Sequence, residues 1–156
     1  MSQFIVRSLD TAHVEAAERR LQDGDPFVRL VDVNAPIGFP CRVTLAWAQP
    51  GEQVLLFRHR PFGPVSPYAE EGPIFARRSA SQAQLSEGEL PAYIAQVPHI
   101  AVRGYDETTS IATAEIAPGA ECAAAIGRAF ANNAVQYAHV RAGAYGCFQF
   151  RVDRAI

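Results

Sequence analysis

Apolar and polar residues alternate along several short segments of this chain, a pattern typical of β-strands with one buried face. Such segments cover residues 3–9, 26–33, 41–59, 99–116 and 135–152. The last three each contain two β-rich runs around a turn, at Pro50–Gly51, Glu107–Thr108 and Gly143 respectively, which predicts three hairpins.

Two segments have helical spacing instead, namely residues 10–24 and residues 118–130. The first has capping residues at its start and Gly24 at its end. In the second, Cys122, Ile126 and Phe130 fall on one stripe. The sequence therefore predicts an α+β fold, with mostly antiparallel β-hairpins forming a sheet and one or two packed helices. A length of 156 residues fits a single domain spanning residues 1–156.

The proline-rich segment 60–73 predicts an ordered loop, because proline removes backbone donors and fixes φ. Within it, Glu70 and Glu71 are adjacent, between Pro67 and the pair Gly72–Pro73. Adjacent residues on an extended chain point opposite ways. We therefore expect one glutamate to face arginines of the sheet and the other to face water. A surface loop fixed by a Glu–Arg salt bridge explains the same spacing without a ligand.

Composition excludes some function classes. The net charge of -2 and the pI near 6.1 argue against nucleic-acid binding, which needs a strongly basic face. No apolar run is long enough to span a membrane, and the start of the chain lacks the pattern of a secretory signal, so we expect a cytoplasmic protein. All 14 basic residues are arginine, so each arginine is weaker evidence for an anion site than usual.

The last hairpin allows a prediction of register. Period-two geometry places Ala138 and Val140 on one face and His139 on the other, and apolar residues of the second strand must match them. The shortest register that does so has a three-residue loop, Ala142–Ala144, and sets Cys147 directly opposite His139. A thiol and an imidazole at that spacing can share a hydrogen bond.

If the last two hairpins share a sheet, one face collects polar and aromatic side chains, namely Arg103, Tyr105, Tyr137, His139, Arg141 and Cys147. Two interpretations stay open. This face is the solvent side of a half-buried sheet, or the loop 61–73 folds over it and makes a polar pocket.

The three cysteines are expected to be free thiols, because Cys41, Cys122 and Cys147 are far apart in the sequence and form no C-x-x-C pair. Cys122 is expected to be a core residue because it lies on the apolar stripe of residues 118–130, whereas Cys41 could approach Cys147. The four histidines have no tight ligand spacing, so the sequence predicts no metal site and no cofactor.

The strings SPYAEEGPIFAR, VRGYD and HVRAGAYGCF, together with Cys41–Arg42, resemble a bacterial family called domain of unknown function 1203. The resemblance covers most of the chain but leaves out the helix at residues 10–24. It implies that characteristic family positions are held by Cys41, Tyr68, Glu70, Gly72, Pro73, Arg103, Tyr105, Asp106, His139, Arg141 and Cys147. It implies no activity, because the family has none established.

Three functions are consistent with these observations. In the first, a small anionic metabolite binds the polar face, where Arg103 and Arg141 neutralise it and Tyr68, Glu70 and Tyr105 orient it. In the second, the protein is an enzyme with Cys147 as nucleophile, His139 as base and Asp106 or Glu70 as the orienting carboxylate. In the third, the same face binds another protein, or a second copy of this chain in a homodimer. The sequence leaves open whether the protein is an enzyme.

Overall fold

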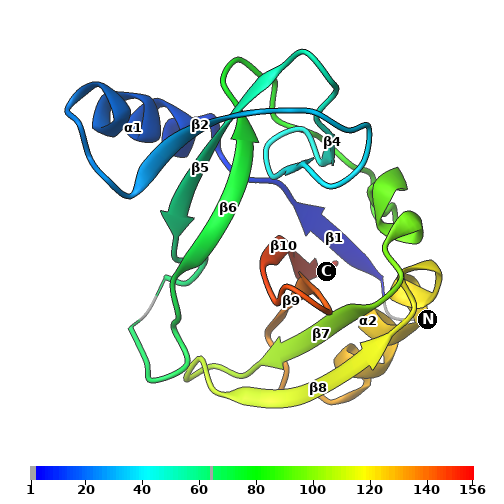
Figure 1. The fold of residues 1–156 in the computed structure, drawn as a ribbon. Coiled ribbons are helices and arrows are strands. Elements are labelled where there is room, and N and C mark those ends of the chain that lie inside the picture. Colours follow the sequence, from blue (N-terminus) through cyan, green and yellow to red (C-terminus); the bar gives the residue numbers. More distant parts are fainter. Residues whose placement is uncertain (1–2, 64) are drawn as a thin grey trace.

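The computed structural model describes residues 3–63 and 65–156, and in this part of the chain ten strands form two five-stranded sheets. The strands of the first sheet, in spatial order, are β1 (Phe4–Arg7), β10 (Phe148–Arg154), β9 (Tyr137–Ala142), β7 (Ile100–Tyr105) and β8 (Ile111–Ala117). Those of the second are β2 (Val28–Asp32), β5 (Gln53–His59), β6 (Gly72–Arg77), β3 (Pro40–Cys41) and β4 (Ala46–Trp47). Apart from the parallel contact of β3 with β6, the pairs are antiparallel, which confirms the predicted α+β class (Figure 1).

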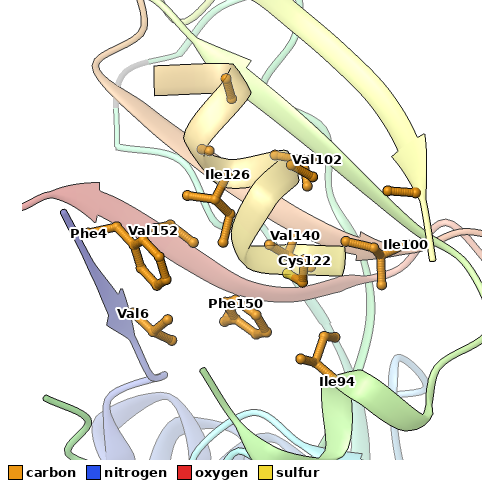
Figure 2. Close-up of a cluster of buried hydrophobic side chains, with 14 of the residues drawn as sticks. Phe4, Val6, Ile94, Ile100, Val102, Cys122, Ile126, Val140, Phe150 and Val152 are labelled. Carbon is orange, nitrogen blue, oxygen red and sulfur yellow. The ribbon is translucent and has the colours of Figure 1, made fainter. Parts of the chain in front are cut away.

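The helix α2 (Cys122–Ala131) covers one face of the first sheet, where it packs on β7, β8 and β9. Its predicted stripe of Cys122, Ile126 and Phe130 is buried, and it meets Val140 and Phe150 in the largest apolar cluster (Figure 2). Each large apolar side chain buried there stabilises the fold by about 1.5–3 kcal/mol. A short 3₁₀-helix, η2 (Gly119–Glu121), precedes α2 and contacts a second one, η1 (Ala92–Gln96).

The helix α1 (Thr11–Gln22) packs on β2 and β5 of the second sheet. It begins where predicted, because the Asp10 carboxylate accepts a hydrogen bond of 2.9 Å from the Ala12 amide. Gly24 follows its end with a φ of 77°, a conformation that glycine adopts without strain. Neither α1 nor any other helix within residues 3–63 and 65–156 is long and apolar enough to cross a bilayer.

The predicted hairpin over residues 41–59 is wrong. Strand β4 pairs with β3 through the tight turn between Cys41 and Leu45, whereas β5 pairs with β2 and β6. The apparent alternation in residues 43–47 therefore belongs largely to a turn, in which Leu45 has a φ of 53°. Strand β6 was not foreseen, because Pro73 lies within it. Proline is tolerated there because β3 pairs with β6 only at Phe75, so β6 is an edge at Pro73.

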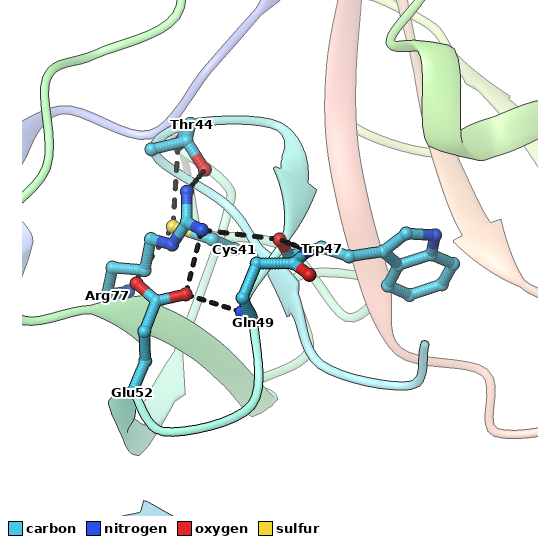
Figure 3. Close-up of polar contacts among 6 residues, drawn as sticks. All are labelled: Cys41, Thr44, Trp47, Gln49, Glu52 and Arg77. Carbon is cyan, nitrogen blue, oxygen red and sulfur yellow. Dashed lines mark hydrogen bonds and ion pairs between the residues drawn. The ribbon is translucent and has the colours of Figure 1, made fainter. Parts of the chain in front are cut away.

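A polar cluster holds the turn of β3–β4 against β6 (Figure 3). Arg77 donates to Glu52 at 2.8 Å and to Thr44 Oγ1 at 3.5 Å. The fully buried Cys41 sulfur accepts the backbone amides of Thr44 and Arg77 at 3.4 and 3.3 Å. Cys41 is therefore a structural thiol of the second sheet.

Candidate functional site

The loop that precedes β6 folds over the face of the first sheet opposite α2. We call residues 60–63 and 65–71 the lid. The Phe62 ring lies 4.7 Å from the ring of His139 and 5.2 Å from that of Tyr105, and Ser66 Oγ donates to the Thr109 carbonyl at 3.1 Å. Of the two interpretations of this face, the structure supports the covered one and not the solvent-exposed one.

Glu70 lies between two arginines of adjacent strands. Its Oε1 accepts a hydrogen bond from Arg103 Nη1 at 2.8 Å and forms an ion pair with Arg141 Nη2 at 3.0 Å. The Arg141 side chain is 7% exposed, whereas that of Glu70 is 53% exposed. Arg141 also donates to the Gly146 carbonyl at 3.0 Å, but its buried Nε has no partner among the described residues.

The neighbouring Glu71 points elsewhere, as expected for an extended segment. Its Oε1 lies 3.7 Å from Arg58 Nε, and both side chains are about half exposed. The prediction that the two glutamates diverge is confirmed, although the second one faces a solvent-exposed arginine.

A cavity of about 220 Å³ opens between the end of the lid, the β9–β10 loop and the end of β5. Its walls are His59, Pro61, Glu70, Glu71, Gly72, Pro73, Arg141, Tyr145, Gly146, Cys147 and Phe148. Around it, the three guanidinium groups of Arg58, Arg103 and Arg141 face two carboxylates. This excess of one positive charge favours an anionic guest.

Two histidines flank Phe148 beside this cavity. The ring of His139 lies 4.9 Å and that of His59 6.1 Å from the Phe148 ring. Burial, followed by the positive charge of Arg141, lowers the pKa of His139 to about 2. Burial also lowers the pKa of His59 to about 4, with smaller effects from His13 and Arg42. Both imidazoles are therefore neutral near pH 7.

Most of this site lies within the region that matches a known protein family. A model of the family described as "Protein of unknown function (DUF1203)" matches residues 38–154, about three quarters of the chain. The chain belongs to the DUF1203 family. The lid, β7, β9 and β10 lie inside the matched region, while α1 and β2 precede it. No curated protein and no solved structure matches the chain.

In this DUF1203 chain Cys147 does not lie opposite His139, so the predicted register is wrong. His139 lies opposite Arg151, and Cys147 lies in the loop between β9 and β10, before a bulge at Phe148–Phe150. Within the described chain, neither ring nitrogen of His139 has a hydrogen-bond partner. The structure thus provides no thiol–imidazole hydrogen bond.

The β9–β10 connection is longer than expected for a physical reason. Gly143 donates its amide to the His99 carbonyl at 2.8 Å, and Gly146 adopts a φ of 73° while donating to the Ala142 carbonyl. These bonds fold residues 143–147 into a five-residue loop that places Cys147 in the cavity wall.

The remaining predicted site residues are placed as follows. Tyr105 is fully buried and stacks with Tyr137 beneath His139, with ring centroids 5.3 and 5.0 Å away. Tyr68 is 46% exposed on the lid and is not among the cavity walls. The Asp106 carboxylate accepts the amides of Thr108 and Ser110 at 2.9 and 3.0 Å, and these bonds hold its pKa below the ordinary value. Asp106 shapes the β7–β8 turn.

Sequence reasoning missed two residues that shape the DUF1203 cavity. His59 lines it from the end of β5. Arg42 is 1% exposed and donates to the Phe148 carbonyl at 2.8 Å and the Pro40 carbonyl at 2.6 Å, so it joins the two sheets at the cavity wall. Its position directly after Cys41 in a family motif was the available signal.

The donor set does not suggest a metal centre. Among residues 3–63 and 65–156, no group of three or more His, Cys, Asp or Glu side chains is arranged to hold a metal ion. The chemistry that the cavity offers is charge neutralisation by arginine together with a thiol at the wall.

Proposed function

We propose that this protein binds a small anion in the cavity beneath the lid, with Arg141 as its principal contact. The observation that carries the proposal is that Arg141 lines the cavity, is almost fully buried, and keeps an Nε–H group without a partner among the described residues. A buried donor without a partner costs about 1–3 kcal/mol, which a ligand oxygen recovers on binding.

The ligand class follows from the same groups. Guanidinium presents a planar fork that matches carboxylate and phosphate oxygens. Glu70 already occupies part of this fork with one carboxylate oxygen. An incoming carboxylate or phosphate therefore competes with Glu70 for this fork. A cavity of about 220 Å³ accepts a small metabolite rather than a drug-sized molecule.

The lid and the aromatic side chains around His139 support the site. Tyr105, Tyr137 and Phe62 pack around His139 and form an apolar layer on the sheet face that carries the two arginines. A lower local dielectric strengthens the attraction between a guanidinium and an anion. Tyr105 thus supports the site from below, whereas Tyr68 is half-exposed on the lid and lies outside the cavity walls.

The proposal is tested by thermal unfolding with a panel of small carboxylates and phosphate, each compared with a neutral analogue at equal ionic strength. Binding to the folded state raises Tm in proportion to ln(1 + [L]/Kd). We expect at least one anion to raise Tm in the wild type and to lose this effect in Arg141→Gln. Arg128→Gln is the matched control, because Arg128 pairs with Glu115 on α2 and β8, away from the cavity. If anions stabilise wild type and Arg141→Gln equally, the site is wrong.

A further inference from the structure

Cys147 differs from the other two cysteines in its access to solvent. Cys41 and Cys122 are 0% exposed, whereas Cys147 is partly exposed and forms part of the cavity wall. In the described chain the three sulfurs form no disulfide. A reagent that enters the cavity therefore meets Cys147, while the other two cysteines stay covered by the fold.

A buried polar chain holds the Cys147 sulfur in place. Gln149 Nε2 donates to the Cys147 sulfur at 3.4 Å and to the Cys147 carbonyl at 3.3 Å, while Gln149 Oε1 accepts a bond of 2.8 Å from the Tyr93 hydroxyl. Gln149 and Tyr93 are 3% and 4% exposed. Arg42 anchors the next residue, Phe148, through its carbonyl. A nucleophile held in this way loses little freedom when it attacks.

Arg141 gives the second, independent observation. It shares the cavity wall with Cys147, its side chain is more than nine-tenths buried, and its Nε–H has no partner in the described part of the chain. The cavity thus combines a thiol with a cation that can hold an anionic group of the same molecule.

We propose that Cys147 forms a mixed disulfide with a small anionic disulfide held at Arg141, a proposal that rests on the anion site above. After the thiol proton leaves to solvent, the Cys147 thiolate attacks one sulfur of the bound disulfide. A new S–S bond forms and the old one breaks. The leaving thiolate takes the electron pair and then a proton from water, so the incoming disulfide is the oxidant.

Thiol–disulfide exchange at Cys147 is compatible with the position of His139 outside the cavity walls. Thiol–disulfide exchange proceeds through the fraction of thiolate present near neutral pH and needs no adjacent base. His139 is absent from the cavity walls. Because Cys41 and Cys122 are covered, the mixed disulfide persists until a soluble thiol removes it.

The experiment compares two aliphatic disulfides of similar size on the reduced full chain. Dithiodipropionate carries a carboxylate at each end, and cystamine carries an ammonium at each end. Adducts are located by peptide mass spectrometry. For each disulfide, the rate constant of its reaction with Cys147 is divided by the rate constant of its reaction with a neutral thiol, N-acetylcysteine amide. We expect a normalised rate on Cys147 about tenfold higher for the anionic disulfide at low salt, and a smaller preference at high salt.

Variants assign the effect. Cys147→Ser removes the adduct, Arg141→Gln abolishes the charge preference, and Arg128→Gln retains it. Reaction of Cys41 or Cys122 in the folded protein reports opening of the structure. If the Arg141→Gln substitution opens the structure, the Arg103→Gln variant is used in its place. The Arg103 side chain is 32% exposed and contacts the same Glu70 oxygen.

Two results overturn the proposal: a Cys147 rate no higher than that of the buried cysteines, or an equal or greater rate with cystamine. Thermal unfolding of Cys147→Ser with adipate, a dicarboxylate without sulfur, separates the two proposals. If adipate raises Tm while Cys147 is inert in the wild type, only the covalent step fails. If adipate has no effect and no charge preference exists, the anion site fails too.

Discussion

Glu70 Oε1 lies 3.0 Å from Arg141 Nη2, a contact that joins a half-exposed lid residue to an almost fully buried arginine of β9. Exposed ion pairs contribute little, typically about 0–1 kcal/mol. An arginine taken out of water behaves differently, because losing its partner leaves a buried charge uncompensated. In the anion site that we propose, the Glu70 carboxylate and a bound anion compete for the same guanidinium.

Replacing Glu70 with glutamine tests this competition. Glu70→Gln removes the charge that Arg103 and Arg141 share, and we expect it to lower the free energy of unfolding by about 1 kcal/mol. It should also strengthen anion binding, because the guanidinium groups lose their internal competitor. Urea unfolding and anion titration measure the two effects.

Glu71→Gln is the matched control. Glu71 lies 3.7 Å from an exposed arginine, so its loss should cost less than about 0.5 kcal/mol and leave anion affinity unchanged. Equal effects of the two substitutions would show that Glu70 has no special role.

Arg42 provides a second prediction, on the wall of the cavity. Arg42→Ala removes donors to the carbonyls of Phe148 and Pro40 and leaves a space in the core, so we expect a loss of about 2–4 kcal/mol. Arg29→Ala, on the exposed edge of β2, should change stability by less than about 0.5 kcal/mol. In the Arg42→Ala variant, Cys147 should also show a smaller preference for the anionic disulfide over cystamine. An Arg42→Ala protein as stable as the wild type would contradict this role.

Much of the candidate site could be predicted from alternation alone. Strands β7 and β9 pair so that Arg103 lies opposite His139 and Tyr105 opposite Tyr137. Period two therefore placed these side chains and Arg141 on one face, and the apolar partners Val102 and Val140 on the other, against α2. Prolines predicted a loop over residues 60–73, of which the last two begin β6, whereas the position of this loop over the sheet was one of two open interpretations.

The register of β9 and β10 could not be predicted in the same way. An apolar pattern fixes which face a residue occupies, but it permits any shift by two residues. The structure keeps the expected faces for Val140, Phe150 and Val152, yet pairs them four residues further along than the shortest loop requires. The glycine-stabilised loop and the bulge decide the register, and the loop depends on the bond from Gly143 to His99, which is distant in sequence.

The pairing partners in the second sheet were missed for a related reason. Residues 46–47 and 53–59 are close in sequence, so a local hairpin was the simplest prediction. The observed partners of β5 are β2 and β6, which come from other parts of the chain. Strand choice of this kind is decided by the whole core, not by local periodicity.

Two glycines, one in η2 and one in α2, give a third prediction. A β-carbon at Gly119 would lie 2.1 Å from the Ile94 carbonyl oxygen and 2.2 Å from that of Val97, so Gly119→Ala must displace backbone. We expect a loss of at least about 2 kcal/mol in urea unfolding. A β-carbon at Gly127, inside α2, meets nothing within 4 Å. Gly127→Ala should therefore stabilise the protein by about 0.5–1 kcal/mol. If both substitutions destabilise equally, the close approach of η1 to η2 is wrong.

His139 gives a prediction that concerns pH. Its ring is 0% exposed among four aromatic rings, and both nitrogens lack partners within the described residues. An unpaired buried polar group destabilises the fold by about 1–3 kcal/mol. We therefore expect His139→Phe to be more stable than the wild type near pH 7, by about 1 kcal/mol or more.

The difference should grow in acid. The pKa of His139 is about 2 in the folded protein, against an ordinary value of 6.5, so the unfolded state binds the extra proton between these limits. The stability linked to the neutral imidazole is thus fully present above about pH 6.5 and falls by about 1.4 kcal/mol per pH unit below it. His139→Phe lacks this loss, while the titration of His59 is common to both proteins. Urea unfolding from about pH 7 to about pH 4 should give diverging curves, and parallel curves would mean that His139 is charged or hydrated in the folded protein.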